Sequence, residues 1–292
     1  MNILTFDIEE WYLEKACFGD RKEKYQIFDY YLSQILEQLD ERHTIATFFC
    51  VGGMAREFPE VVRKIANHGH EIGCHSNQHV WLNKLTEKQL LADTRDAIDS
   101  IEQCIGQKVL SYRAPAFSIG EHNKWALGIL AQCGIERDAS IFPAVRDFGG
   151  FSAFGSQEPC IVKYEGVEIK EFPITTARLL GKDVAYSGGG YFRFFPLSFI
   201  VREMKKSDYA MTYFHIGDLI PESESMMTKE AYEEYFKQKG TLLNRYKRHI
   251  KSNLGKKGAF CKMKKLINRF EYVSIDEASS QIDWKSAPVV VL

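Results

Sequence analysis

The residues best suited to chemistry are two histidines and an acidic cluster. The segment HSNQH places His75 and His79 four residues apart, which lets both imidazoles reach one divalent cation from a helical turn or a tight loop. Serine follows His75, so the HExxH pattern of metalloproteases is excluded. Asp7, Glu9 and Glu10 supply carboxylates after an apolar N-terminal run. Two histidines and one carboxylate predict a hydrolytic metal site, with zinc expected first and cobalt or nickel as alternatives.

Three further polar residues stand where predicted strands end. Arg113 follows the run VLSY, Asp138 follows IER, and His215 closes the run YAMTYF. Taken singly, an acid at a strand end is usually a helix cap, and a lone histidine is usually structural. In parallel α/β folds, however, ligands bind beyond the carboxyl ends of the strands. The joint occurrence of these residues therefore predicts one shared site.

The elements that position these residues follow from hydrophobic periodicity. The predicted strands are apolar runs at 2–6, 44–51, 71–74, 109–114 and 209–215. Helical patterns separate them, and Thr86 with Gln89 has the spacing of a capping box for a helix that ends near Ile105. The alternation of strands and helices predicts an α/β fold in one domain over 1–292, most simply a barrel.

Composition excludes several classes of protein. The 292 residues include 38 Lys plus Arg against 39 Asp plus Glu, and 45% are hydrophobic, which is typical of a globular protein and excludes a disordered chain. The seven cysteines are odd in number and never form a CxxC pair, which argues against a disulfide framework or a thiolate zinc site. The N-terminus lacks a basic region, and no apolar run reaches 18 residues. We therefore expect no signal peptide, no transmembrane segment and a cytoplasmic location.

Six segments follow one another along the chain in this order: TFDIEEW, ATFFCVG, HGHEIGCHSNQH, YRAPAFS, RDASIFP and YFHIGD. They resemble the motifs of the polysaccharide deacetylase family, carbohydrate esterase family 4, also described as the chitooligosaccharide-deacetylase homology domain. The segments SGGGYFRFFP and FEYVSIDEA look like the subgroup associated with bacterial exopolysaccharide and surface-polysaccharide biosynthesis. The resemblance implies a distorted (β/α) barrel with fewer than eight strands, and metal-dependent removal of N-acetyl groups from a glycan.

The resemblance also implies a role for each candidate residue. Asp7 looks like the catalytic base, and Arg113 like the residue that pairs with it and orients it. His215 looks like the general acid, and Asp138 like the partner that tunes this acid. In this mechanism the metal lowers the pKa of a water molecule, Asp7 accepts its proton, and His215 protonates the departing amine.

One position departs from the commonest family pattern. Relatives usually have two adjacent aspartates, whereas this chain has Ile8 after Asp7. The carboxylate that joins His75 and His79 at the metal is then Glu9 or Glu10. We favour Glu9, because residues 7 and 9 share a face if the strand continues.

Aromatic residues near the motifs are candidates for contact with sugar rings, whose apolar faces suit aromatic planes. Tyr191, Phe192 and Arg193 form either such a rim or a turn that leads into a strand. Trp81 and Trp11 each follow a motif, and either has a substrate-binding or a core role. Pro115, in the YRAPAF segment, is placed with the substrate-binding set by the resemblance.

The C-terminal part contains a basic segment, 245–270, expected to pack on the catalytic domain. Ten Lys or Arg and no Asp or Glu occur from Arg245 to Arg269, so the rest of the chain carries a balance of −11. A solvated helix face is the commoner explanation of such a run. If the run is functional, a membrane surface or a diphosphate-linked glycan is favoured over nucleic acid, because no nucleic-acid motif accompanies it.

The favoured function is therefore metal-dependent N-deacetylation of an acetylated glycan, or of a lipid-linked or nucleotide-linked sugar. One alternative keeps the barrel and hydrolyses a non-sugar or cyclic amide, with or without a metal. Another is a catalytically silent carbohydrate-binding relative, which would be indicated if Asp7 and His215 lay too far apart to flank one substrate atom.

Overall fold

The centre of the molecule is a group of parallel strands. The computed structural model describes residues 1–9, 21–145, 149–223, 225–236 and 238–292. Strand β1 (Asn2–Ile8) lies between β10 (Ala210–His215) and β2 (Thr47–Cys50) and pairs in parallel with both. In this register Asp7 is the direct partner of His215. Two candidate residues that are far apart in the sequence thus lie at the same end of neighbouring strands.

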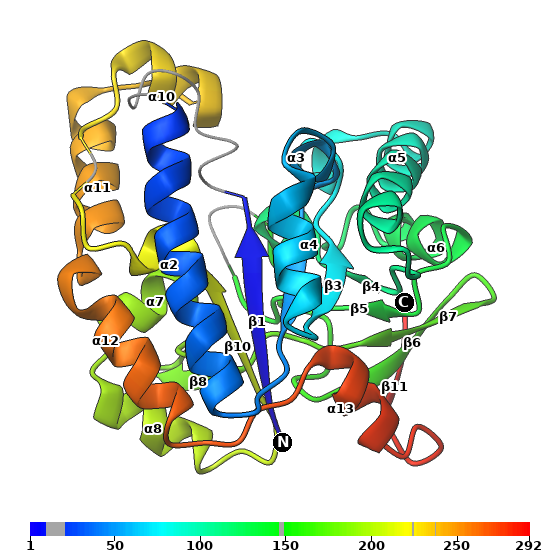
Figure 1. The fold of residues 1–292 in the computed structure, drawn as a ribbon. Coiled ribbons are helices and arrows are strands. Elements are labelled where there is room, and N and C mark those ends of the chain that lie inside the picture. Colours follow the sequence, from blue (N-terminus) through cyan, green and yellow to red (C-terminus); the bar gives the residue numbers. More distant parts are fainter. Residues whose placement is uncertain (10–20, 146–148, 224, 237) are drawn as a thin grey trace.

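These strands belong to one mixed sheet (Figure 1). Its order is β10-β1-β2-β3-β4-β5-β7-β6-β11, in which β6 and β7 form the antiparallel pair and the other neighbours are parallel. The expected α/β fold with a parallel sheet is confirmed. Within the described residues, the ladder ends at β10 and at β11, so the sheet is open and does not close into a complete barrel.

The remaining strands are short. They are β3 (Glu71–Cys74), β4 (Ser111–Tyr112), β5 (Arg137–Asp138), β6 (Cys160–Tyr164), β7 (Val167–Glu171) and β11 (Val289–Val291), with β8 (Thr176–Leu179) and β9 (Lys182–Ala185) as a separate hairpin. The run 109–114 was expected to be a longer strand, but only two of its residues form β4. Residues 113 and 114 leave the sheet immediately and build the site.

Helices in the first half alternate with the strands as expected. They are α2 (Arg21–Glu41), α3 (Gly52–Glu57), α4 (Pro59–Asn67), α5 (Glu87–Ile105) and α6 (Trp125–Gln132), with short 3-10 turns at Leu82–Lys84 and Pro115–Phe117. The predicted capping box of α5 is confirmed: the side chains of Thr86 and Gln89 bond each other's backbone N–H.

The second half combines β6 to β11 with a further series of helices. Its helices are α7 (Gly189–Phe194), α8 (Leu197–Met204), α9 (Ile216–Leu219), α10 (Lys229–Phe236), α11 (Leu242–Asn253), α12 (Lys256–Ile267) and α13 (Ile275–Gln281). The segment SGGGYFRFFP, expected as a turn leading into a strand, forms helix α7 instead. Position 188, just before this helix, requires glycine, because a Cβ there would collide with the ring of Tyr213 on β10.

Aromatic packing holds β1 to its two neighbours. The Phe6 ring stacks on Phe48 of β2 at 4.8 Å between centroids and contacts Phe214 of β10 at 5.7 Å. All three side chains are fully buried. The carboxyl ends of β1 and β10 are therefore fixed by a rigid core. Among the described residues, no helix is both long and apolar enough to span a bilayer.

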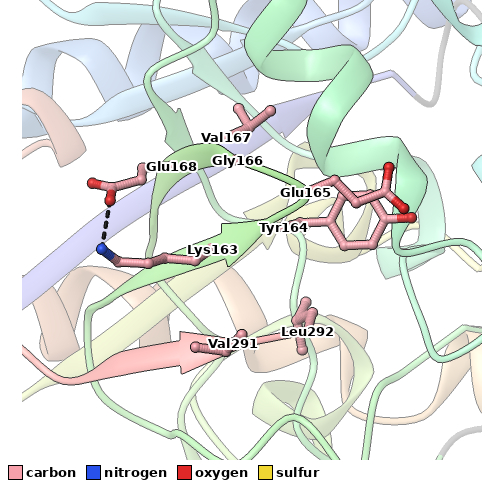
Figure 2. Close-up of a pocket in the computed structure, with 8 residues that line it drawn as sticks. All are labelled: Lys163, Tyr164, Glu165, Gly166, Val167, Glu168, Val291 and Leu292. Carbon is pink, nitrogen blue, oxygen red and sulfur yellow. Dashed lines mark ion pairs between the residues drawn. The ribbon is translucent and has the colours of Figure 1, made fainter.

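The opposite edge of the sheet carries the β6–β7 hairpin and β11. Its turn residues Glu165 and Gly166 both have positive φ, the geometry of a tight two-residue hairpin. Figure 2 shows a pocket here, lined by the hairpin and by Val291 and Leu292, with an ion pair between Lys163 and Glu168. This pocket is at the far edge from β10 and is separate from the predicted site.

Candidate functional site

A buried ion pair joins the end of β1 to the segment after β4. The guanidinium of Arg113 donates through Nη1 to Asp7 Oδ1 at 2.8 Å and to the hydroxyl of Thr5 at 2.8 Å, and through Nε to the carbonyl of Ala139 at 3.2 Å. Its charge also lies 4.3 Å from the ring centroid of Phe49. Both partners of the pair are buried. The structure thus brings Asp7 and Arg113 together and holds the Asp7 carboxylate in one orientation.

Glu9, His75 and His79 converge beside this pair. One nitrogen or oxygen from each lies within 4.8 Å of the others. His75 Nε2 lies 2.9 Å from Glu9 Oε2, and His79 Nε2 pairs with the same oxygen. Burial alone raises the pKa of Glu9, but the two imidazoles outweigh burial and hold that pKa well below its ordinary value. Glu10, the alternative carboxylate, lies outside the described residues.

The hydrogen bonds of His75 test whether a metal fits. Its Nδ1 lies 2.7 Å from the carbonyl of Arg113, which can only accept, so Nδ1 carries the proton. A neutral ring would present the lone pair of Nε2 to a carboxylate oxygen 2.9 Å away. Two acceptors in contact need a proton or a cation between them. The donor set and this orientation fit a divalent ion held by Glu9, His75 and His79.

The two histidines sit on a tight loop after β3, not on a helical turn. Ser76 and His79 both have positive φ, which is uncommon for residues other than glycine. The Ser76 hydroxyl accepts from the His79 N–H at 2.9 Å, and the Asn77 N–H donates to Asp93 on α5 at 2.9 Å. The Gly52 N–H at the start of α3 also donates to the Ser76 carbonyl. These bonds hold a strained backbone that aims both imidazoles at Glu9.

His215 completes the cluster from the end of β10. Its Nε2 lies 3.6 Å from Asp7 Oδ2 and 3.4 Å from Glu9 Oε1, and a quarter of its side chain is exposed. Its Nδ1 lies 3.3 Å from Asp218 Oδ2, in the short helix α9. Asp218 Oδ1 in turn pairs with Arg193 Nε at 3.0 Å. Burial raises the pKa of Asp218, but the contacts with His215 and Arg193 outweigh burial and lower it overall.

Asp138, expected beside His215, faces a different group. Its Oδ1 accepts from the Ser140 hydroxyl at 2.5 Å, its Oδ2 accepts from the Ser140 N–H at 3.3 Å, and its carboxyl also interacts with that of Glu171 on β7. Burial, followed by the charge of Asp138, raises the pKa of Glu171 well above its ordinary value. The expected Asp138–His215 contact is therefore wrong: β5 delivers Asp138 toward β7, and Asp218 takes the position at the imidazole.

Comparison with known protein families gives a match for each half of the chain. Residues 4–137 match the family model "Polysaccharide deacetylase". These residues belong to the polysaccharide deacetylase family. Residues 139–280 match the model "Domain of unknown function (DUF3473)". The deacetylase match supplies Asp7, Glu9, His75, His79 and Arg113, whereas His215 and Asp218 come from the second match.

Curated relatives and solved structures agree with this placement. The chain is 34% identical over 94 residues to a peptidoglycan-N-acetylglucosamine deacetylase of Bacillus cereus, covering 32% of this chain and 34% of that protein. It is 33% identical over 89 residues to the peptidoglycan-N-acetylmuramic acid deacetylase PdaC of Bacillus subtilis, covering 30% and 19%. The chain thus spans about a third or less of these relatives. A polysaccharide deacetylase structure from Mycobacterium smegmatis, described as putative, has the same fold, with a TM-score of 0.66, 16% identity and coverage of 100% and 92%.

Most of the predicted sugar-binding residues are placed differently from expectation. Phe192 is 0% exposed and packs edge-to-face on Phe214, so a rim role for it is wrong. Arg193 and Pro115 are also buried, and Arg193 binds backbone carbonyls of α11 and the carboxylate of Asp218. Tyr191 is half-buried against the core.

Trp81 lies partly exposed near the loop that carries His75 and His79. Its ring lies under the ammonium group of Lys84, 3.8 Å from the ring centroid. Trp81 therefore remains a prediction for substrate contact. Trp11 lies outside the described residues.

Sequence analysis did not predict two partners of the candidate residues, Asp218 and Glu171. Asp218 stands three residues after His215, in the segment FHIGD, and that spacing could have signalled a local contact between an acid and a histidine. Glu171 gave no comparable signal, because its contact with Asp138 depends on how β7 pairs with β5.

Proposed function

We propose that the protein is a metal-dependent hydrolase that removes N-acetyl groups from a glycan or glycan precursor in bacterial surface-polysaccharide assembly. The observation that carries this proposal is the convergence of the Glu9, His75 and His79 donors with Asp7 and His215 at one end of the sheet. The names of the Bacillus relatives, which are peptidoglycan deacetylases, support the same reaction class.

The residues divide the work of amide hydrolysis between them. A divalent ion, with zinc favoured, would supply Lewis-acid polarisation of the amide carbonyl when bound. Asp7 accepts the proton of the attacking water, and Arg113 holds its carboxylate in place. His215, 3.6 Å from Asp7, donates a proton to the departing nitrogen. The products are acetate and a free amino sugar.

The alternatives fit less well. Hydrolysis without a metal would need a proton on Nε2 of His75 to satisfy its 2.9 Å contact with Glu9, and His75 would then serve only as the counterion of Glu9. A silent carbohydrate-binding protein would have no need for Asp7 and His215 within 3.6 Å of each other beside a metal triad. Because β10 pairs with β1 and brings His215 to the triad, we treat residues 1–292 as one catalytic unit.

The decisive experiment combines metal analysis with acetate release. Wild-type protein reconstituted with zinc, cobalt or nickel should bind about one ion per chain and release acetate from some member of a panel of acetylated glycans. His75→Ala should lose both the metal and the activity. The matched control is His68→Ala, which removes a surface imidazole paired with Asp40. Absence of metal from reconstituted wild type would exclude the proposal.

The cysteines support the expected cytoplasmic location as part of this proposal. The six described cysteines are free, including Cys50 and Cys74, which are register partners on neighbouring strands. Disulfides persist in oxidising compartments, so free thiols at such a position favour a reducing one. A membrane-impermeant maleimide should label the exposed Cys261 only after cells are opened. Labelling of Cys261 in intact cells would contradict this location.

A further inference from the structure

Helix α11 presents an apolar stripe to solvent. Leu242, Tyr246 and Ile250 recur every four residues, and Leu243 and Leu254 lie beside them. Each of these five side chains is between 45% and 65% exposed. Residues spaced by four lie on one face of a helix, so the five form a continuous strip along α11, which lies at the outside of the molecule (Figure 1).

The inner side of the same helix is polar. Arg245 donates through Nη1 to the Met227 carbonyl at 3.2 Å, and Asn244 donates to the Lys239 carbonyl at 2.9 Å. Ser252, the buried residue of this helix, bonds carbonyls of the preceding turn. A surface helix of a globular protein normally buries its apolar stripe and exposes its polar side. In α11 this arrangement is inverted.

Specific contacts hold α11 in this inverted orientation. The buried guanidinium of Arg193 donates to the carbonyls of Lys251 at 3.0 Å, of Ser252 at 2.5 Å and of Leu254 at 3.2 Å. At the other end, Thr241 caps the helix by accepting from the Asn244 N–H. The helix is therefore docked through its polar side, and rotating its apolar stripe inward would break these bonds.

We propose that α11 is an interfacial helix that binds the surface of an anionic lipid bilayer. Lys247 and Lys251 follow Leu243 at intervals of four, so two exposed ammonium groups border the apolar strip. The ten basic residues from Arg245 to Arg269, with no acid among them, extend this positive charge into α12. An apolar face bordered by lysines is the pattern of helices that lie in the membrane interface. The cores of protein interfaces are instead depleted of lysine.

If the proposed function holds, the position of α11 also indicates the class of substrate. Arg193 binds the C-terminal end of α11 and also Asp218, which contacts His215. The interfacial helix and the catalytic cluster are thus parts of one rigid framework. A glycan carried on a lipid is the substrate class that such an enzyme would meet at the bilayer.

Vesicle sedimentation tests the membrane surface independently of catalysis. Full-length protein should sediment with phosphatidylcholine vesicles that contain phosphatidylglycerol, and much less with phosphatidylcholine alone. The triple variant Leu243→Ser, Tyr246→Ser, Ile250→Ser should bind at least about tenfold more weakly. Lys247→Gln with Lys251→Gln should lower binding to anionic vesicles and reduce its salt dependence. The matched control, Leu180→Ser, removes an exposed leucine at the turn between β8 and β9 and should bind like wild type.

A depth measurement adds a second readout. Tyr246→Trp should show fluorescence that bromine-labelled lipids quench, whereas Leu180→Trp should not. Failure of wild type to bind anionic vesicles would overturn the proposal, as would undiminished binding of the triple variant. Self-association of wild type that the triple variant abolishes, without vesicle binding, would assign the strip to a second copy of the chain. Vesicle binding by wild-type protein that shows no deacetylase activity would contradict the proposed function but not the membrane proposal.

Discussion

Substitution of Asp7 is expected to change both the turnover and the stability of the protein. Asp7→Asn keeps an oxygen for the Arg113 hydrogen bond but can no longer accept a proton, so kcat should fall by about a hundredfold or more. The buried guanidinium also loses its counterion, which should lower the free energy of unfolding by about 3 kcal/mol. Acetate release and urea unfolding check the two effects, with metal content unchanged. Near-normal turnover would transfer the base role to Glu9.

Asp218 is predicted to position the imidazole of His215. Asp218→Asn should lower turnover of an acetylated amine on the order of tenfold, with a much smaller loss for an activated aryl acetate, whose leaving group needs no proton. Asp138→Asn is the matched control, because Asp138 contacts Ser140 and Glu171 instead of His215. Equal losses on both substrates for Asp218→Asn, or the selective loss for Asp138→Asn, would show that the assignment is wrong. Metal content should be unchanged in both variants.

The helices and strands that sequence analysis predicted correctly are those set by residues close together in the chain. The capping box at Thr86 and the strands that carry Asp7 and His215 follow from neighbouring residues. Helix α7 was missed because three glycines resemble a turn, whereas Gly188 serves a close approach to Tyr213 on a distant strand. The partner of His215 was also mispredicted. The resemblance pointed to Asp138, whereas Asp218 meets the ring because α9 turns directly after β10.

The attachment of α13 to the sheet depends on Glu71. Its carboxylate accepts from the hydroxyls of Thr47 at 2.6 Å and Ser111 at 2.5 Å, and from the Asp276 N–H at the start of α13 at 2.9 Å. Glu71→Gln places a donor against these donors and should lower the free energy of unfolding by about 2 to 3 kcal/mol, as measured in urea. Glu168→Gln, in an exposed pair, should cost about 1 kcal/mol or less. Equal effects of the two variants would contradict the role of Glu71.

For the whole molecule, charge and topology divide the surface into two regions. The sheet brings the candidate catalytic cluster to the carboxyl ends of β1, β3 and β10, at one side of an open sheet. The positive charge lies on α11 and α12, while the rest of the chain carries a balance of −11. The sequence could predict this asymmetry but not its geometry, because the exposure of Tyr246 and Ile250 depends on which side of α11 docks.

The buried pair of Asp138 and Glu171 makes the stability of the whole molecule depend on pH. Burial and the neighbouring charge raise the pKa of Glu171, so the folded protein keeps a proton that the unfolded chain releases above the ordinary value of 4.5. The stability from this group is complete below that value and is lost as the pH rises toward the folded pKa. The slope is at most about 1.4 kcal/mol per pH unit. Glu171→Gln keeps an acceptor for the Ile141 N–H and a donor toward Asp138 at every pH. Unfolding free energies measured in urea across this range should therefore fall less steeply with pH for the variant, and parallel curves for the two proteins would contradict the shared proton.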